Sequence, residues 1–390
     1  MRMDELLLAV IREQLNGETP REETAKAITA DILPRLYPLA MHHDMAHLVS
    51  AYLDKLNLSE DDPTVAAFKQ AQLTQVFRHH RILAEQTRIC AVLESACIPY
   101  LPLKGAVIRD MYPEGWYRPS CDIDILVGRE DLKRAVTALV EKLGYSASDV
   151  EHFHDVDLYS KGGVHLELHF NILENMDNLD QTLRRVFDYA TPVSDGGYAL
   201  KLTDTFLVFH VVAHCYYHFL RGGCGIKPLM DLFVISNRGG LNVDENELRS
   251  LLEETNTARF YDVCLELVKV WFEGKPHTDL TERMARYILS GGVYGSVENT
   301  IAVKRNGPGR SRIGYLWSRI FMPYSDLKIK YPVLNKHPYL TPIMHIVRWF
   351  GLLSPTKRCK AMNEMRINSV IDGNRLQEVE SLLCDLGIER

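Results

Sequence analysis

The sequence is poor in the features that mark several common protein classes. Its eight cysteines stand singly, at positions 90, 97, 121, 215, 224, 264, 359 and 384. Because none forms a CxxC pair, the sequence predicts neither a zinc ribbon nor a redox-active dithiol. Isolated free thiols are typical of a reducing compartment, so we expect a cytoplasmic protein.

Long apolar runs are absent as well. The apolar run near the N-terminus is short and is interrupted at Arg12 and Glu13, which indicates an amphipathic helix and not a secretion signal. Later apolar stretches are interrupted by histidine or arginine, and none reaches the ~20 residues of a membrane span. We therefore expect no membrane span.

An excess of positive charge is also missing, since 45 Lys and Arg face 51 Asp and Glu, for a net charge of −6. No overall field draws the chain to nucleic acid, and a polynucleotide partner is disfavoured. The 390 residues, 46% hydrophobic and 25% charged, suffice for two or three packed units of a globular protein. The chain contains no internal repeat and no low-complexity tract.

Local patterns divide the chain into three regions. Residues 1–97 read as a helical region, because apolar residues recur there at helical spacing. Residues 98–200 mix strand and helix patterns and form the expected catalytic core. Residues 201–390 are again mostly helical, with a break rich in Gly, Pro and Arg at 305–312.

The middle region carries the strand patterns. The expected elements are, in order, a short extended segment at 100–103, a short helix after Lys104-Gly105, a strand at 121–127, a helix at 130–143, strands at 155–160 and 164–170, and a second hairpin within 190–200. This order predicts an α+β fold, with a small mixed sheet, helices on one face of it, and helical regions on either side in the chain.

Two carboxylates mark the strand at 121–127. Asp122 and Asp124 are two residues apart, so both side chains leave the same face, while Ile123 and Ile125 point to the core. Like charges this close repel unless a cation lies between them, and Mg²⁺ with oxygen ligands would resolve the repulsion. A solvated edge strand with its polar face outward is the alternative.

Glu167 lies in the middle of a very apolar strand, VHLELHF, and shares one face with His165 and His169. An acidic residue in so apolar a strand lowers the stability of the protein unless its carboxylate is exposed to solvent or paired. If this strand lies beside the strand at 121–127, Glu167 completes a three-carboxylate cluster. Such a cluster could hold two metal ions that activate an attacking oxygen and neutralise a leaving pyrophosphate.

A phosphate site is expected just upstream. Gly105 lies at the turn from strand to helix, where backbone N–H groups can approach phosphate closely, and Lys104 adds a positive charge. Arg118 could contact phosphate too, or could form a surface ion pair instead.

These residues lie in a recognisable run. LPLKGAVIRDMYPEGWYRPSCDIDILV, followed by LGY and by GGVHLELHF, resembles the bacterial "uncharacterised nucleotidyltransferase" family, a branch of the DNA polymerase β-type nucleotidyltransferase superfamily. The resemblance is specific over residues 98–170 and weaker over 200–235 and 315–350. Members of the superfamily carry a Gly-Ser pair at a helix start, Asp-x-Asp on a strand and a third acid on a neighbouring strand.

The resemblance implies roles for individual residues. Gly105 corresponds to the glycine, Asp122 and Asp124 to the paired metal ligands, and Glu167 to the third acid. The chain departs from the pattern at Ala106, which replaces the serine, so phosphate binding would depend on backbone N–H groups and Lys104. The third acid is Glu where polymerases have Asp, which leaves its role as a base less certain than its position.

The helical region after 201 offers further candidates. His210, His214 and His218 share one helical face; a zinc site is one interpretation, but no HExxH motif is present, and a wall of the nucleotide or acceptor pocket is favoured. Lys227 and Asp231 lie one helical turn apart. They could form a solvated ion pair or part of a pocket wall. We assign His169, His214, Lys227 and Asp231 to the expected acceptor pocket.

The sequence therefore predicts a Mg²⁺-dependent nucleotidyltransferase that moves a nucleoside monophosphate from a triphosphate, expected to be ATP, to an acceptor hydroxyl. The acceptor, a small molecule or a protein, is left open. Two rival hypotheses are a non-catalytic nucleotide-binding module and, more weakly, a zinc hydrolase built on the 210–218 helix. The segment from 304 to 330 contains seven basic residues and one acid, Asp326. It could form a solvated basic surface or a site for an anionic group.

Overall fold

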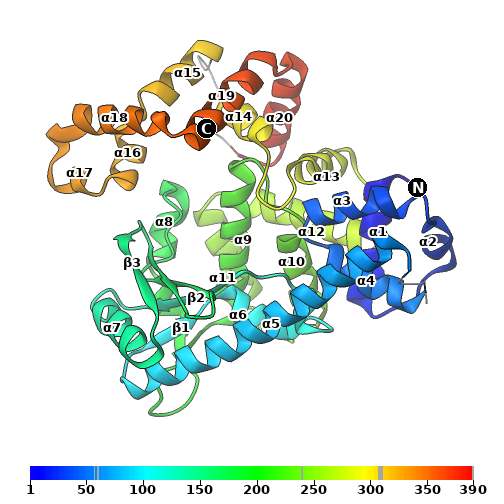
Figure 1. Ribbon diagram of the computed structural model, residues 1–390, viewed down its shortest axis with the longest axis horizontal. Helices are drawn as coiled ribbons and strands as arrows, with labels where there is room; N and C mark the ends of the chain where they lie inside the picture. Colours follow the sequence, from blue (N-terminus) through cyan, green and yellow to red (C-terminus); the bar gives the residue numbers. More distant parts are fainter. Residues whose placement is uncertain (57, 59–60, 239, 306–310, 389–390) are drawn as a thin grey trace.

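The computed structural model describes residues 1–56, 58, 61–238, 240–305 and 311–388 (Figure 1). A small sheet lies inside a largely helical molecule, so the expected α+β class is confirmed. No helix among the described residues has the length and apolar character needed to cross a membrane.

The N-terminal region is helical, as expected. Its helices are α1 (Met3–Asn16), α2 (Glu22–Ala27), α3 (Leu33–His42), α4 (Ala46–Lys55) and α5 (Pro63–Ser95). The side chain of Asp62 accepts hydrogen bonds from the N–H groups of Thr64 and Val65, and Pro63 occupies the first helical position, where a missing N–H is harmless. The long helix α5 passes beneath the sheet in Figure 1.

The sheet has five strands in the order β1-β2-β5-β4-β3. The strands are β1 (Tyr100–Pro102), β2 (Asp122–Val127), β3 (Ser146–Glu151), β4 (Asp155–Tyr159) and β5 (His165–His169). β2 and β5 are parallel and the other neighbours are antiparallel, which makes the sheet mixed. Strand β3 was not predicted from the sequence, because its segment SASDVE offers only one large apolar side chain.

Alternation along β2 gives the sheet an apolar and a polar face. Ile123 and Ile125 pack with the second half of α5 and with α7 (Leu132–Leu143) in one hydrophobic core. Asp122 and Asp124 leave the opposite face. On the side of the polar face, α6 (Lys104–Ile108) packs beside β1 and β2, and α9 (Asp204–Leu220) lies across a cavity.

A larger core joins the two ends of the chain. It contains buried side chains of α1, α3 and α4 together with those of the helices that follow residue 203, so the N-terminal and C-terminal helices pack as one body. Between the five-stranded sheet and α9 lie α8 (Asp177–Leu183) and the hairpin of β6 (Ala190–Pro192) and β7 (Leu200–Leu202). The helices after α9 that contribute to this core are α10 (Lys227–Arg238), α11 (Glu245–Glu254), α12 (Ala258–Glu273), α13 (Asp279–Gly291), α14 (Val297–Arg305) and α20 (Gly373–Asp385).

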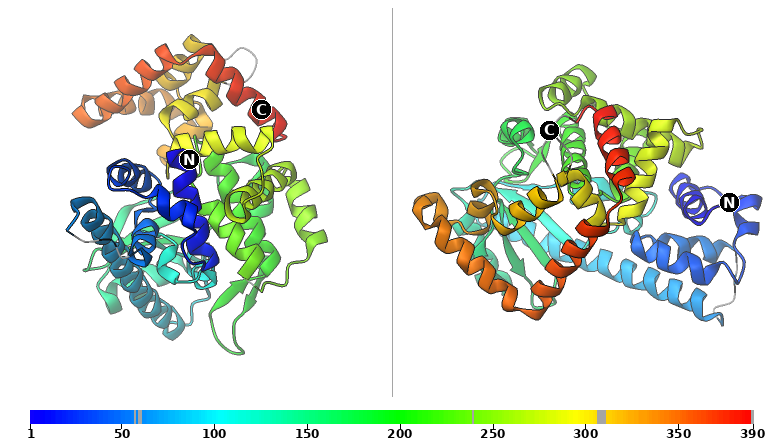
Figure 2. Two further views of the ribbon diagram at one scale, coloured as in Figure 1. Left: turned by 90° about the vertical axis from the view of Figure 1, so that its right-hand side faces the viewer. Right: turned by 90° about the horizontal axis from the view of Figure 1, so that it is seen from above.

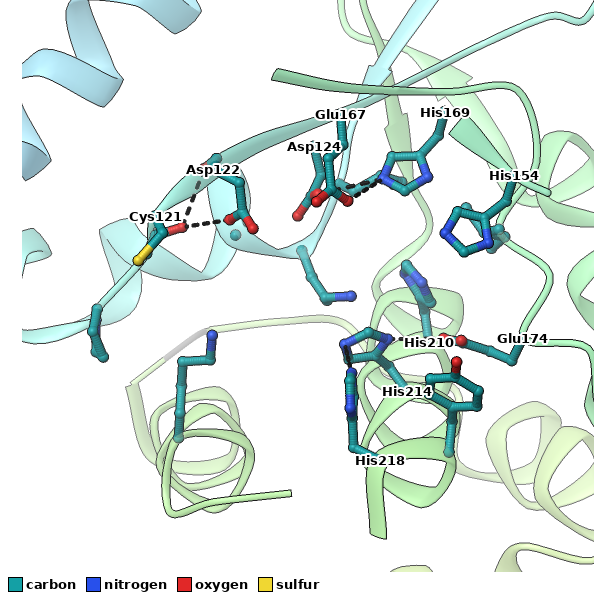
Figure 3. Close-up of a pocket in the computed structure, with 18 of the residues that line it drawn as sticks. Cys121, Asp122, Asp124, His154, Glu167, His169, Glu174, His210, His214 and His218 are labelled. Atoms are coloured by element: carbon teal, nitrogen blue, oxygen red, sulfur yellow. Dashed lines mark hydrogen bonds and ion pairs between the residues drawn. The ribbon is translucent and has the colours of Figure 1, made fainter. Parts of the chain in front are cut away.

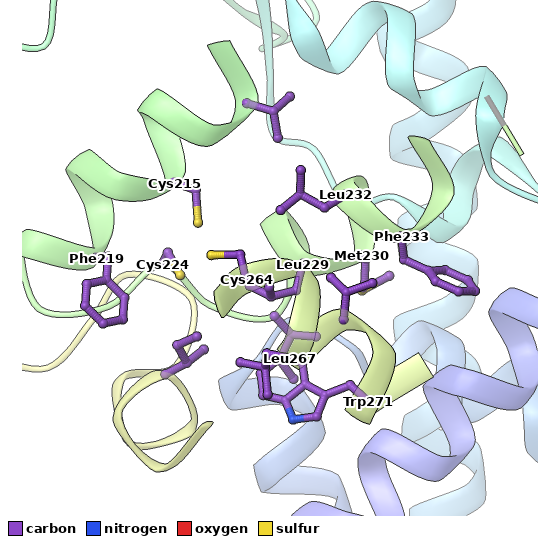
Figure 4. Packing of buried hydrophobic residues seen from close by; sticks show 14 of the residues in the cluster. Cys215, Phe219, Cys224, Leu229, Met230, Leu232, Phe233, Cys264, Leu267 and Trp271 are labelled. Atoms are coloured by element: carbon purple, nitrogen blue, oxygen red, sulfur yellow. The ribbon is translucent and has the colours of Figure 1, made fainter. Parts of the chain in front are cut away.

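Three cysteines meet in this core. Cys215, Cys224 and Cys264 are buried beside Leu229 and Leu267 (Figure 4). All eight cysteines are free thiols. The three buried ones therefore act as small apolar side chains that fill the contact between helices α9, α10 and α12.

The remaining helices form an arm that projects from this body (Figures 1 and 2). The arm consists of residues 312–370, with α15 (Arg312–Ile320), α16 (Tyr324–Lys330), α17 (Val333–Lys336), α18 (Thr341–Phe350) and α19 (Pro355–Val370). The break expected at 305–312 falls largely on residues 306–310, which lie outside the described part of the chain.

Candidate active site

A cavity of about 370 Å³ opens between the polar face of the sheet and the helices α9 and α10 (Figure 3). Its walls come from β2, β5, the start of α6, the segment after β5, α9 and the start of α10. The cavity therefore collects residues from positions 44 to 294 of the chain.

The carboxylates predicted from the sequence converge on one side of this cavity. β2 and β5 are neighbours, and Asp124 pairs directly with Glu167 in their register. Oxygen atoms of Asp124 and Glu167 and a ring nitrogen of His169 lie within 4.8 Å of one another, and Asp122, His165 and Glu167 form a second such group. Glu167 belongs to both groups, so it joins the two aspartates into one cluster.

His169 contacts two of the three acids in this cluster. Its Nε2 lies 3.3 Å from Asp124 Oδ1 and 3.6 Å from Glu167 Oε2. The His169 ring stacks on His154, with centroids 5.4 Å apart, and His154 in turn lies 3.1 Å from the carboxylate of Asp155. This stack fixes the orientation of the His169 ring.

The acids of the cluster differ in their tendency to ionise. Burial opposes ionisation of Asp124, but the hydrogen bond from His169 and the charges of His169 and Lys104 outweigh burial and hold the pKa of Asp124 below its ordinary value. Burial, together with the negative charge of Asp124, raises the pKa of Glu167 to about 7. The fold thus places a carboxylate where its charge is opposed, which is common at functional sites.

The donor atoms fit a hard divalent cation. Asp122, Asp124 and Glu167 supply carboxylate oxygens, the ligands that Mg²⁺ prefers. The three side chains are partly exposed to the cavity, so a cation there keeps room for ligands from a substrate. A cation between them would also favour the ionised form of Glu167, which the neighbouring charges oppose.

The residues expected at the phosphate lie on an adjoining wall. Lys104 and Gly105 line the cavity at the start of α6. A Cβ at Gly105 would lie only 3.3 Å from Nη1 of Arg118, so the glycine leaves room for that guanidinium. Arg118 also borders the cavity, but its side chain is only 3% exposed.

Arg118 and Asp231 form a buried ion pair, which neither sequence interpretation of these residues anticipated. Arg118 donates from Nε to Asp231 Oδ1 at 2.8 Å and from Nη2 to Oδ2 at 2.9 Å, and the hydroxyl of Tyr112 donates to Oδ1 at 2.7 Å. Asp231 thus pairs with Arg118 and not with Lys227. It reaches only an adjoining chamber of about 120 Å³, whereas Lys227 lines both spaces.

Histidines of α9 form the wall opposite the carboxylates (Figure 3). His214 Nδ1 lies 2.8 Å from Glu174 Oε1, and His218 Nε2 lies 2.9 Å from His214 Nε2. Burial holds the pKa of His210 and of His214 well below the ordinary value, so both rings are neutral near pH 7. Among the described residues, the three histidines of α9 do not form a group of three or more candidate metal ligands.

Several residues of the cavity carried no signal in the sequence. Asp44, His154, Glu174, Tyr217 and Tyr294 all line it. His154 and Glu174 lie in irregular segments before β4 and after β5, so no periodic pattern could place their side chains. Only the packing of distant segments brings them to the site.

Comparison with known proteins agrees with this geometry. The sequence pattern of a family described as "Uncharacterised nucleotidyltransferase" matches residues 32–273. The chain belongs to this family. The match begins within the N-terminal helices and ends at α12, so it includes every element that lines the cavity except the segment around Tyr294. Searches of curated proteins and of solved structures gave no match.

The buried ion pair gives a prediction about stability. Arg118→Ala leaves the Asp231 carboxylate buried beside Tyr112 without its cation, and breaking such a pair costs about 3–5 kcal/mol. The matched control is Arg185→Ala, which removes an ion pair with Glu254 that is 41% exposed on both sides and should cost less than about 1 kcal/mol. Urea unfolding measures both free energies; equal losses would contradict the structural role of Arg118.

The raised pKa of Glu167 gives a second prediction. Its pKa is about 7 in the folded protein against an ordinary 4.5, so the stability that its proton contributes is present at low pH and is lost as the pH rises through 7. Glu167→Gln removes this loss. In EDTA the variant should melt at a higher temperature than the natural protein at pH 8, and the difference should be much smaller at pH 5, close to the ordinary pKa of 4.5.

The exposed Glu380→Gln variant is the control for that measurement and should show no difference that depends on pH. Adding Mg²⁺ at pH 8 should narrow the gap between Glu167→Gln and the natural protein, because a cation stabilises the ionised carboxylate. A gap of the same size at pH 5 and pH 8 would mean that packing, and not charge, sets the stability of this position.

Proposed function

We propose that the protein transfers a nucleoside monophosphate from a Mg²⁺-bound triphosphate, with ATP as the expected donor, to an acceptor hydroxyl and releases pyrophosphate. The observation that carries the proposal is the pairing of Asp124 with Glu167 across parallel strands, with Asp122 on the same face and a cavity beside all three. Membership of a nucleotidyltransferase family supports it.

Each acid has a proposed task. Asp122, Asp124 and Glu167 would hold Mg²⁺, as a two-ion site, and the metal would neutralise charge on the triphosphate and activate the acceptor oxygen. Glu167 would also accept the proton of the acceptor hydroxyl, since its carboxylate lines the cavity beside the proposed metal site. His169 would orient Asp124 and Glu167 through its Nε2.

The triphosphate would lie along the wall formed by α6 and the start of α10. Lys104 and Lys227 bring two ammonium groups to this wall, and Gly105 lets the backbone approach closely. Arg118 is bound to Asp231 through two of its nitrogens. We therefore propose that Arg118 supports the wall beside Gly105 and contacts phosphate through Nη1 at most.

The acceptor would face the histidine wall. His210, His214 and Tyr217 present neutral polar groups to the cavity, and Glu174 fixes the His214 ring. Neutral donors and acceptors at a pocket wall suit an acceptor with several hydroxyl groups. Asp231 lies behind Arg118 and serves this pocket as a support, not as a contact.

The rival hypotheses fit the geometry less well. A non-catalytic nucleotide-binding module has no need of a third acid whose charge is opposed in the fold, since this lowers stability. A zinc hydrolase on α9 would need His214 and His218 as ligands, but these two rings bind one another and Glu174. The resemblance to DNA polymerase β-type enzymes supports transfer chemistry for the same cluster.

Transfer is tested with triphosphates that carry a label on the α-phosphorus, together with cell extracts as the source of acceptor. We expect pyrophosphate release that depends on Mg²⁺, with the label recovered on small molecules or on protein. Asp122→Asn and Asp124→Asn should each lower the rate about 10³-fold or more, because each removes charge that holds the cation.

Asp131→Asn is the matched control, since it changes an acid that follows the same strand but pairs with Arg134 at the surface. It should keep full activity. A natural protein that binds a non-hydrolysable triphosphate but releases no pyrophosphate from any labelled nucleotide would instead identify a nucleotide-binding module. Full activity of Asp122→Asn would contradict the proposed metal site.

A further inference from the structure

Helix α18 turns its apolar side away from the protein. Ile343, Ile346, Val347 and Phe350 follow the spacing i, i+3, i+4, i+7 of one helical face, and they are 51%, 47%, 46% and 65% exposed. The other side faces the arm, where Arg348 donates to backbone oxygens of α15. Amphipathic helices of globular proteins normally bury their apolar face, so this helix has the reverse orientation.

The exposed apolar surface continues beyond α18. Leu353, which follows this helix, is 76% exposed, and on α15 Ile313 is 76% and Trp317 63% exposed. The rings of Trp317, Phe321 and Trp349 link the two helices, with centroids 4.6 Å and 5.6 Å apart. The arm therefore exposes large apolar and aromatic side chains on two of its helices, and exposed apolar surface of this extent marks interaction sites.

The arm is also strongly basic. Residues 312–370 contain ten Lys and Arg but only two Asp and Glu, whereas the rest of the chain has 35 and 49. One of the two acids, Glu364, pairs with Arg319. Most of the basic residues of the arm are exposed: Arg312, Lys330, Lys336, Lys357, Arg358, Lys360 and Arg366.

We propose that this arm docks on an anionic lipid surface, with the apolar face of α18 in the interface and the basic residues at the headgroups. Apolar insertion and attraction of Lys and Arg to anionic lipids are the two contributions that hold amphipathic helices on membranes, and tryptophan favours the same depth. The body of the protein is acidic, so the lipid surface would attract the arm and repel the body. Docking would hold the protein at a membrane without a span.

A second copy of the chain fits this surface less well. Two arms in contact would bring their like charges together. The acidic body offers charge complementarity, but over its much greater length its described residues include only twelve exposed large apolar side chains, such as Leu73 and Phe77 on α5, against seventeen on the arm. The arm would need a large apolar partner as well as negative charge, and an anionic bilayer offers both.

Co-sedimentation of the full chain with vesicles tests the proposal. We expect binding to phosphatidylcholine vesicles that contain phosphatidylglycerol and none to pure phosphatidylcholine, with weaker binding as salt rises. Phe350→Asp should weaken binding about tenfold or more, because it removes an aromatic ring that would insert into the lipid interface and puts a negative charge in its place. Phe77→Asp is the matched control, since Phe77 is 63% exposed on the body, and it should bind as the natural protein does.

A double variant, Lys357→Glu with Arg358→Glu, should also lose binding to the anionic vesicles. Unchanged melting temperatures show that the variants fold, because all these side chains lie at the surface. The proposal is overturned if the natural protein ignores anionic vesicles, or if Phe350→Asp converts a dimer into a monomer without changing vesicle binding. Pyrophosphate release is measured separately, so failure of lipid binding and failure of the proposed function are distinguishable.

Discussion

The repulsion between carboxylates on adjacent parallel strands is the constraint on which the site depends. Asp124 and Glu167 are direct neighbours in the register of β2 and β5, and the charge of Asp124 helps to raise the pKa of Glu167. Stability alone would favour an uncharged pair at this position. The surrounding groups reduce the repulsion only in part. His169 and Lys104 favour the ionised form of Asp124, whereas at Glu167 burial and the charge of Asp124 outweigh the favourable charge of His169.

The walls of the cavity keep the carboxylate cluster in place. Ile123 and Ile125 anchor β2 in the core beneath the sheet, so its acids cannot turn away from the cavity. Arg118 crosses to Asp231 of α10 and thereby connects the loop before β2 to the helical body. This bidentate pair is one of the contacts that join the sheet region to the helices beside the cavity. The cavity thus lies between the sheet, which packs on one hydrophobic core, and the helices α9 and α10 of the larger core.

The sequence predicted what local periodicity encodes. Alternation in CDIDILV placed Asp122 and Asp124 on one face of their strand, and alternation in VHLELHF placed Glu167 on the face of its strand that bears His165 and His169. In the structure β2 and β5 are neighbours and Asp124 pairs with Glu167, so the three acids lie on the same face of the sheet. Strand β3 lacked such a pattern and was missed. The partner of Asp231 was missed for a different reason, because Arg118 lies more than a hundred residues away and only the docking of α10 on the sheet brings them together.

Helix α18, whose apolar face is exposed, shows that periodicity predicts an apolar face but not whether that face is buried. Its apolar residues have ordinary helical spacing, and the sequence alone would place them in the interior. Arg348 and Trp349 donate to the last turn of α15 and orient α18 through hydrogen bonds to its backbone oxygens. This leaves the apolar face without a partner in the described part of the chain. The positive charges of the arm oppose contact between two copies of it, and the same charges would favour a negatively charged partner.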